Sequence, residues 1–397
     1  MNRGMVLAIL VMVPIALLNG CWDRRDPELR GHVTAVAFDV EEGGGFHVIA
    51  QISNHLALTG GQNGDRGAGE ARSFWVVSAN GRTPLDAMRN LAPGTSRELF
   101  WAYTEVVLLS EELARRGVGP VMDLFERERQ LRTGALIAVV TGDLRMLMES
   151  EAPLDETGSK GLHRLMFTLP LERSTFPTKR ITDLYMRLAA PGQEMLIGKM
   201  QVLVEDWEEE HVHVPPATVG GAALFRGDRM VGWADGEEVV GWAYASGRST
   251  RCKMLIEPPG EETPISLSLS RVMHQIRPVH DDGGVRIELT LHGEGEIQSF
   301  PAQGNLALES EFIRSLEKRA AESIRSRIEA TLARSQELNS DILGLGNLIY
   351  RKNYGLWNEI GEDWDDIFPT LVVDIKVHVN IARTGLTTDS LQIGGGK

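Results

Sequence analysis

The chain has 397 residues, more than one ordinary domain holds and enough for two or three. Hydrophobic residues make up 42% and charged residues 24% of it, a balance that excludes a disordered protein. With 55 acidic and 41 basic side chains the formal net charge is −14, which repels nucleic-acid phosphates and anionic lipid headgroups. We therefore expect no nucleic-acid partner, and any membrane attachment must come from something other than a basic patch.

The first twenty residues have the layout of an export signal. Arg3 and the free amine make a short positive segment, and residues 5–18 carry no charge. This stretch is shorter than the about 20 apolar residues that span a bilayer, so it is typical of a secretory signal that is removed. The segment ends in Leu18-Asn19-Gly20-Cys21, which resembles the lipobox of bacterial lipoproteins.

We predict that residues 1–20 are a signal peptide, that the chain is cut before Cys21, and that Cys21 carries lipid. Residues 21–30 then form a polar spacer, and the membrane holds the protein through two or three acyl chains at about 0.8 kcal/mol per buried methylene. Loss of Arg3 with the signal changes the net charge from −14 to −15. The alternatives are an uncleaved anchor with a chance cysteine and an ordinary secretory signal.

Cys252 is the only other cysteine, and two cysteines are too few for a disulfide scaffold. If Cys21 carries lipid, Cys252 has no partner within the chain. We interpret Cys252 as a small buried apolar residue, and a reactive thiol is the alternative.

Short strands and helices alternate over residues 31–150, which favours an N-terminal α+β domain. Strands are predicted at residues 33–38, 46–52, 73–78, 99–109 and 135–141. Helices are predicted at residues 83–91, 110–117, 120–131 and 143–148, with Thr83, Ser110 and Asp143 as caps. The glycine-rich residues 58–70 are expected to form a surface loop.

Residues 151–215 are less regular, and we expect them to form a small middle region or a second subdomain. A helix is predicted there at residues 179–188 and a strand at residues 196–204. Pro215-Pro216 marks the expected start of a C-terminal α+β domain over residues 216–397.

The C-terminal part is expected to place strands before one long amphipathic helix. Strands are predicted at residues 222–225, 239–244, 253–256, 265–269, 272–276, 285–291 and 371–381. The last of these alternates apolar and polar side chains, so we expect one of its faces to lie in a core. The long helix covers residues 309–338 and has its apolar side chains near one face, so we expect it to lie across a sheet; a partner-binding helix is the alternative. A second helix is expected at residues 341–351. The predicted fold is therefore α+β and multi-domain, with mixed sheets and packed helices.

The search for chemistry finds one weak candidate. His211 and His213 would share a strand face among acidic residues, but spacing supplies no third metal ligand, and a charged turn beside a strand is the alternative. No nucleophile elbow, zinc-protease helix or paired-cysteine motif occurs in the sequence. We expect no metal, no cofactor and no catalytic residue, and hence no enzyme.

Four groups of residues together carry a resemblance. They are Gly20-Cys21-Trp22-Asp23-Arg24-Arg25, Leu131-Arg132-Thr133 before an apolar strand, Gly221-Ala222-Ala223-Leu224-Phe225 with the following Val231-Gly232-Trp233 and Asp235-Gly236-Glu237-Glu238, and residues 341–385. The last contains Gly344-x-Gly346, Arg351-Lys352, Trp357, Trp364, Phe368-Pro369 and Arg383-Thr384-Gly385. In this order they resemble the Ger(x)C family, the lipoprotein C subunits of bacterial spore germinant receptors. The resemblance covers essentially the whole mature chain and is thin across about residues 150–200.

The resemblance implies a role rather than a reaction. Members of that family sit on the outer face of the spore inner membrane, assemble with two integral membrane subunits, and take part in nutrient-triggered germination. They have no known catalytic site. A solute-binding lipoprotein of an uptake system is the alternative, and it would have two similar α/β lobes.

Overall fold

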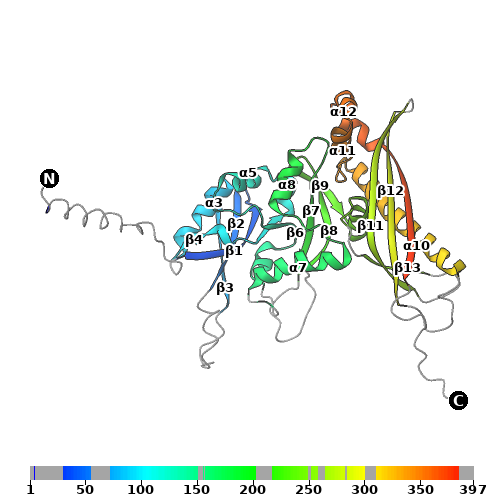
Figure 1. The fold of residues 1–397 in the computed structure, drawn as a ribbon. Coiled ribbons are helices and arrows are strands. Elements are labelled where there is room, and N and C mark those ends of the chain that lie inside the picture. The colour runs from blue at the N-terminus through cyan, green and yellow to red at the C-terminus, as the bar shows by residue number, and fades with distance from the viewer. Residues whose placement is uncertain are drawn as a thin grey trace, which may run out of the picture.

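A computed structural model describes residues 30–54, 72–150, 155, 157–202, 217–248, 252–257, 264–281, 284–299 and 310–383, together with Gly4. Two mixed β-sheets follow one another along an elongated molecule, and helices pack on both (Figure 1). The chain therefore has the α+β fold with mixed sheets that the sequence predicts.

The first sheet has nine strands in the order β3-β2-β1-β5-β6-β7-β8-β9, with β4 beside β1. Their bounds are β1 (Arg30–Val40), β2 (Phe46–Ser53), β3 (Phe74–Gly81), β4 (Glu98–Phe100), β5 (Val106–Ser110), β6 (Leu136–Thr141), β7 (Leu196–Val202), β8 (Ala217–Arg226) and β9 (Arg229–Ala234). The central strands β1, β5, β6 and β7 run parallel, while antiparallel pairs finish both edges. Parallel strands are covered on both faces, which explains the nearly continuous apolar runs of β5 and β6.

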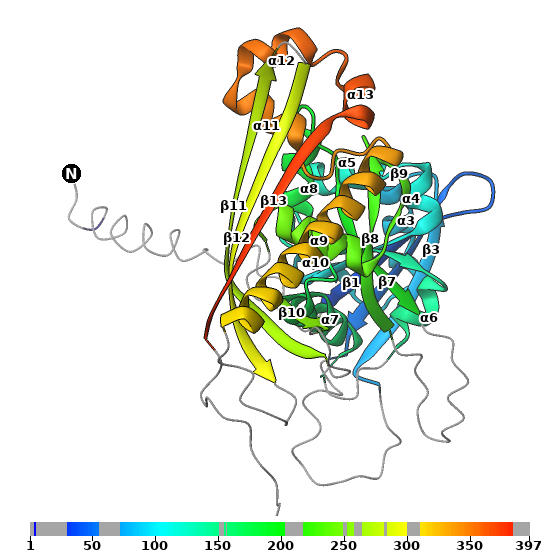
Figure 2. The same ribbon diagram turned by 90° about the vertical axis from the view of Figure 1, so that its right-hand side faces the viewer.

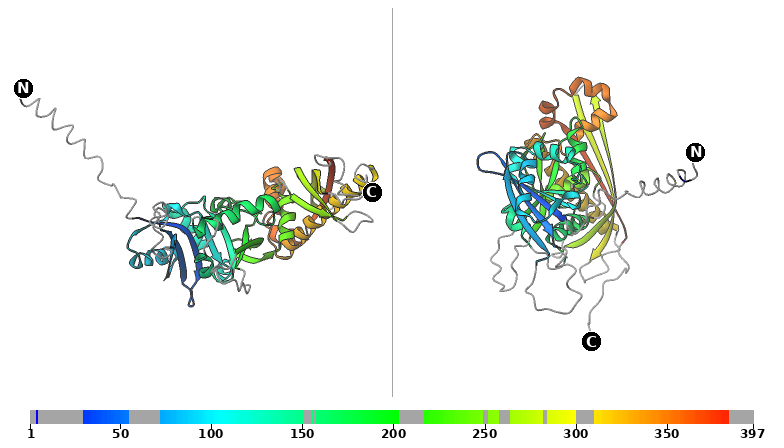
Figure 3. Two further views of the ribbon diagram at one scale, coloured as in Figure 1. Left: turned by 90° about the horizontal axis from the view of Figure 1, so that it is seen from below. Right: turned by 90° about the vertical axis from the view of Figure 1, so that its left-hand side faces the viewer.

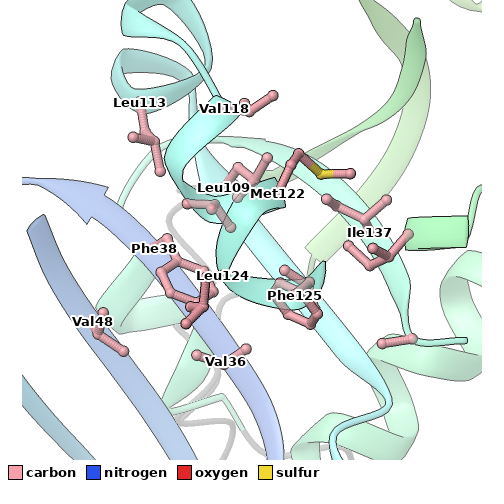
Figure 4. Close-up of a cluster of buried hydrophobic side chains, with 14 of the residues drawn as sticks. Val36, Phe38, Val48, Leu109, Leu113, Val118, Met122, Leu124, Phe125 and Ile137 are labelled. Atoms are coloured by element: carbon pink, nitrogen blue, oxygen red, sulfur yellow. The ribbon is translucent and has the colours of Figure 1, made fainter. Parts of the chain in front are cut away.

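Helices cover both faces of this sheet. They are α3 (Pro84–Asn90), α4 (Glu111–Arg116), α5 (Gly119–Arg127), α6 (Leu144–Met148), α7 (Gly158–Arg173) and α8 (Ile181–Leu188), with the short 3-10 turns η3 (Ala92–Gly94) and η4 (Trp101–Tyr103). On one face α5 lies over the strands, and Figure 4 shows Leu124 and Phe125 against Phe38 of β1. The Phe38 and Phe125 rings meet edge to face at 6.3 Å, a favoured aromatic geometry. A second apolar core, with α6 and α7, fills the other face.

The predicted helix caps are confirmed. Thr83 Oγ1 accepts the Asp86 N–H at 3.1 Å, Ser110 Oγ accepts the Leu113 N–H at 3.1 Å, and Asp143 Oδ1 accepts the Arg145 N–H at 2.7 Å. Each bond satisfies an N–H that the first helical turn leaves unpaired.

The second sheet has the order β10-β11-β12-β13. Its strands are β10 (Cys252–Ile256), β11 (Ile265–Asp281), β12 (Gly284–Ser299) and β13 (Val372–Arg383). The long helix α10 (Ser310–Glu337) crosses one face of this sheet (Figure 2), where its buried residues meet the strands. The alternation predicted for the last strand is confirmed, because its odd-numbered apolar side chains pack into this core: Val373, Ile375, Val377, Val379 and Ile381.

Helix α9 (Gly236–Ala245) joins the two sheets. It packs against β8 and against α10, and Gly241 makes the second contact possible. A Cβ at Gly241 would lie 2.1 Å from the Arg327 carbonyl oxygen, so only glycine permits this approach. Thr331 Oγ1 donates across the same contact to the Glu238 carbonyl oxygen at 2.6 Å.

Four short elements lie between α10 and β13: α11 (Leu345–Lys352), α12 (Tyr354–Ile360), α13 (Trp364–Ile367) and the 3-10 turn η6 (Phe368–Thr370). They form a small helical cap near one end of the β11–β12 hairpin (Figure 2). Trp364, Phe368 and Leu345 bury their side chains there with Ile287 of β12.

Several predicted elements were wrong. Residues 239–244, predicted as a strand, belong to α9, and the segment around Pro170 forms helix α7, which was not predicted. The strand predicted at 99–109 is interrupted by η4 between β4 and β5. The two strands predicted at 265–269 and 272–276 are one strand, β11, with an irregular register between Ser270 and Met273.

The first sheet continues past the predicted domain start at residue 216. Strand β7, in the predicted middle region 151–215, pairs with β6 on one side and with β8 on the other. Strands β8 and β9 extend the same sheet to Ala234. We therefore propose that the two domains divide between β9 and β10, with α9 at the join.

Several predicted features lie outside the described residues. They are the signal peptide, Cys21 and most of its spacer, the loop at 58–70, and His211 and His213. Within the described part of the chain, no helix combines the length and apolar character needed to cross a membrane.

Candidate functional site

A pocket opens where the loop before β7 meets the helical cap. It has a volume of about 350 Å³, which suits a small molecule. Its walls come from both sides of the proposed domain division: Leu188, Ala190, Pro191, Gly192, Gln193, Glu194 and Gly227 before it, and Asn339, Asp341, Trp357, Gly361, Glu362, Trp364, Asp365 and Phe368 after it. The most specific part of the motif at 341–385 therefore lies around a cavity.

Asp341 organises the turn that enters α11. Its Oδ1 accepts the N–H groups of Gly344 at 2.7 Å and of Leu345 at 3.0 Å, and its Oδ2 accepts that of Gly346 at 2.8 Å. These donors belong to the first turn of the helix, where backbone N–H groups have no partner within the helix. Burial raises the pKa of Asp341 to about 6, although the three bonds act in the opposite direction.

The glycines of the motif let this turn meet the loop before β7. A Cβ at Gly346 would lie 2.9 Å from Gly192 Cα and 2.7 Å from the indole nitrogen of Trp364. The Asn347 N–H donates to the Gly192 carbonyl oxygen at 2.9 Å, and the Glu194 N–H donates to the Asp341 carbonyl oxygen at 2.9 Å. Backbone bonds therefore hold the two segments together.

Two tryptophans form one wall of the pocket. The Trp357 and Trp364 rings lie 5.7 Å apart, and Phe368 continues the row at 6.0 Å from Trp364. Trp364 is buried and Trp357 is partly buried, so both belong mainly to the core of the cap rather than to an exposed interface.

Carboxylates surround the opening. Glu194 Oε2 accepts the Gly227 N–H at 2.7 Å, and burial raises the pKa of Glu194 to about 7, with Asp365 and Asp341 adding to the rise. Asp365 is paired with Arg226 at 2.6 Å on the rim. Acidic groups around aromatic faces attract a small cation in preference to an anion.

Two buried basic side chains, Arg187 and Lys179, lie behind the pocket. Arg187 donates to the carbonyl oxygens of Glu194 at 3.1 Å and Ile342 at 3.2 Å, which ties α8 to the turn before α11. Lys179 is 1% exposed, and its Nζ lies 4.6 Å from the centre of the Trp242 ring. Burial, together with Arg187 and Arg248, lowers the pKa of Lys179 to about 6.

The structure brings some of the residues singled out in the sequence to the pocket and places others elsewhere. Gly344, Gly346, Trp357 and Trp364 come together at the pocket. Cys252 is far from it in the fold, at the start of β10 opposite Leu269, and only its backbone is described. Among the described residues, no group of three His, Cys, Asp or Glu side chains is placed to hold a metal ion.

Sequence reasoning missed the first half of this site. Gly192, Glu194 and Arg187 stand in the segment where the family resemblance is thin, and nothing near them has the spacing of a known motif. Pro191-Gly192 after a helix is a turn signal, but a turn signal alone does not indicate a binding site.

Comparison with known proteins identifies a family for both parts of the chain. The family model "Spore germination protein N-terminal domain" matches residues 23–202, and "Spore germination B3/ GerAC like, C-terminal" matches residues 220–385. Spore germination protein KC of Bacillus subtilis (strain 168) is 24% identical, over 99% of this chain and 98% of that protein. Spore germination protein YndF of the same organism is 22% identical, over 97% of this chain and 98% of that protein.

A solved structure has the same fold. The crystal structure of the GerBC protein superposes with a TM-score of 0.55 at 17% identity, covering 88% of this chain and 97% of that one. The two family models together account for both sheets, the helical cap and the pocket between them. The chain therefore belongs to the GerAC-like family of spore germination proteins, as the residues at its two ends predicted.

Proposed function

We propose that this chain is a non-catalytic subunit of a spore germinant receptor, held by a lipid on Cys21 at the outer face of the cytoplasmic (spore inner) membrane. It would act there with two integral membrane subunits and be needed for nutrient-triggered germination. One observation carries the proposal: both family domains match in order, and the first begins two residues after Leu18-Asn19-Gly20-Cys21.

The lipid gives this role a physical basis. Confinement to a thin layer at the membrane raises the effective concentration of the protein near membrane partners, so weak contacts suffice for assembly. Two or three acyl chains provide durable attachment, whereas one gives only reversible binding. The acidic net charge of −14 means that the attachment does not depend on anionic lipids.

The junction between the two halves supports a role in assembly. Backbone hydrogen bonds, the glycine contact and Arg187 join the loop before β7 to the turn before α11. A subunit joined in this way presents two surfaces in a defined relation to each other.

A solute-binding lipoprotein remains the second candidate, and the pocket is the observation that favours it. Its volume of about 350 Å³ suits a metabolite, and its carboxylates suit a cationic group. The fold favours the first candidate, because a nine-stranded and a four-stranded sheet are not two similar lobes. A thermal-shift screen separates the two: a large, specific shift with one metabolite favours solute binding.

The deciding experiment is germination of spores that carry Cys21→Ser, with membrane fractionation of the same spores. Cys252→Ser is the matched control, because it removes the other cysteine and leaves the predicted lipid site intact. We expect Cys21→Ser protein to leave the membrane fraction. Those spores should lose the response to nutrients but still germinate with a non-nutrient trigger, and the control should behave like wild type.

Two results would count against the proposal in different ways. If Cys21→Ser protein leaves the membrane and nutrient germination is unchanged, the anchor is correct and the assigned role is wrong. If the protein stays on the membrane with its first residues uncleaved, the anchor itself is wrong.

A further inference from the structure

The start of β1 and the second sheet lie at opposite ends of the elongated molecule (Figures 1 and 3). Strand β4 pairs with the first residues of β1, so Arg30, Gly31 and His32 are opposite Glu98, Leu99 and Phe100. This end of the first sheet is where the described fold begins after the predicted lipid site.

Aromatic rings gather on one side of the start of β1. The Arg30 guanidinium carbon lies 4.5 Å from the centre of the Phe100 ring. The Tyr103 ring in η4 lies 4.6 Å from the His32 ring, tilted by 49°, and meets the Phe100 ring edge to face at 5.7 Å. Tyr103 is 51% exposed, so about half of its ring faces solvent beside these two neighbours.

A second exposed ring lies on the other side of the same strand start. Gly31 faces away from Arg30 and His32, because successive residues of a strand point to opposite faces. It lines a hollow of about 240 Å³ with Trp75, Arg97 and Leu99. Trp75, at the beginning of β3, is 51% exposed. Tyrosine and tryptophan thus bracket the place where the chain leaves the fold toward Cys21.

The length of chain before β1 limits how far this end can lie from a bilayer. Arg30 is nine residues after Cys21, and an extended chain covers at most about 3.3–3.6 Å per residue, or roughly 30 Å in total. A lipid on Cys21 would therefore keep the start of β1 close to the headgroups, whatever path the spacer takes.

Charge does not explain an attraction to lipid at this end. Arg30 and Arg97 are accompanied by Glu98 and Glu105, and the whole chain is acidic. Exposed tryptophan and tyrosine do provide an attraction to lipid, because their amphipathic rings favour the headgroup region of a bilayer. An exposed ring of each kind, next to a lipid tether, is the arrangement that such a contact needs.

We propose that the end of the first sheet at the start of β1, with Tyr103 on one side and Trp75 on the other as its principal contacts, rests on the lipid headgroups and orients the molecule with its second sheet away from the membrane. The proposal rests on the lipid anchor of the proposed function. To that anchor it adds a defined side of the molecule that contacts the membrane. Strands β10–β13 and the helical cap then face partners beyond the bilayer surface.

The test is quenching of tryptophan fluorescence by brominated phosphatidylcholine, with the full lipidated chain in vesicles. The chain has eight tryptophans, and Trp22 directly follows the proposed lipid site Cys21, so the contribution of Trp75 is isolated with Trp75→Phe in a chain that already carries Trp22→Phe. Trp233→Phe is the matched control, because Trp233 is partly exposed on β9, away from the start of β1. We expect Trp75→Phe to remove about half or more of the bromine-dependent quenching and the control to leave it unchanged.

Flotation of the same vesicles separates the two ways of failing. If the wild-type chain floats with the vesicles and Trp75→Phe does not change the quenching, the anchor stands and the proposed face is wrong. If the chain does not float, the anchor fails and the orientation fails with it. Equal thermal unfolding of wild type and Trp75→Phe shows that the substitution leaves the fold intact.

Discussion

Gly192 and Gly346 touch backbone to backbone, although they belong to opposite halves of the sequence. A Cβ at Gly192 would lie 2.8 Å from Gly346 Cα and 2.6 Å from the Trp357 ring, and a Cβ at Gly346 would lie 2.9 Å from Gly192 Cα. Carbon atoms pack at about 3.5–4.0 Å, so neither position has room for a methyl group. This contact closes one wall of the pocket and joins the first sheet to the helical cap.

Gly346→Ala should therefore destabilise the protein, by about 1–3 kcal/mol in the free energy of unfolding. The sign of the change in stability is informative, because Gly346 lies within α11, where helix propensity alone would make alanine more stable than glycine by about 1 kcal/mol. Thermal or urea unfolding measures the change. Gly134→Ala is the control, since a Cβ there meets nothing within 4 Å. A Gly346→Ala protein as stable as the control would show that the two loops can move apart at little cost.

Asp341→Ala should lower the free energy of unfolding more than removal of an ordinary surface acid does. It leaves the N–H groups of Gly344, Leu345 and Gly346 without their acceptor in a buried place, at about 1–3 kcal/mol for each group that finds no water. Asp363→Ala is the matched control, because Asp363 is exposed and makes no side-chain cap bond to α13. Equal unfolding midpoints for the two variants would contradict the role given to Asp341.

The errors in the sequence-based prediction have a common physical origin. Helix α9 is buried on all sides from Val239 to Ala245, so it lacks the 3.6-residue alternation that identifies a surface helix. Its valines and aromatic residues then resemble a strand. The local signal that could have identified it was the capping box, in which Asp235 and Glu238 each accept the other's backbone N–H.

Prediction succeeded where local chemistry decides the structure. The caps at Thr83, Ser110 and Asp143, the amphipathic face of α10 and the alternation of β13 all depend on residues that are close in sequence. The pocket depends on long-range contacts instead. Residues of the motif in the second half line one wall of it, but the sequence predicted no pocket there, and nothing near Glu194 indicated that its loop forms the other wall.

Glu194→Gln should change how stability depends on pH. Burial raises the pKa of Glu194 to about 7, so between its ordinary value near 4.5 and about 7 the folded protein binds a proton that the unfolded chain has lost. Stability contributed by this group is thus present below about pH 4.5 and is lost as pH rises through 7. Glutamine keeps an acceptor for the Gly227 N–H and carries no charge. We expect the variant to gain stability relative to wild type as pH rises from 5 to 8, in unfolding curves measured at each pH.

The control for that experiment is Glu362→Gln, an exposed acid on the same rim. It should follow wild type across the whole range. If Glu194→Gln does the same, the carboxylate of Glu194 is as well solvated as a surface group, and the pocket is open to water on that side.

Lys179→Met should remove a pH dependence of stability that is opposite in sign to the one expected for Glu194. Burial lowers the pKa of Lys179 to about 6 from the ordinary 10.5, so between those values the unfolded chain binds a proton that the folded protein lacks. Stability therefore rises with pH across this window. Methionine has a similar length and no charge, so it should stabilise the protein most at pH 6 and below, with a gain that shrinks toward pH 10. Lys318→Met, on the exposed side of α10, is the control.

The outcome also decides what the contact between Lys179 and Trp242 does. If Lys179→Met gains stability at pH 7, the lysine is neutral in the fold. The attraction to the Trp242 ring at 4.6 Å is then weaker than the cost of removing water from an ammonium group. If the variant loses stability at pH 7, the lysine is charged, and its attraction to the Trp242 ring outweighs both burial and the nearby Arg187 and Arg248. In that case α9 is held against the first sheet by a buried cation, and the join between the two sheets should weaken as pH rises and the charge is lost.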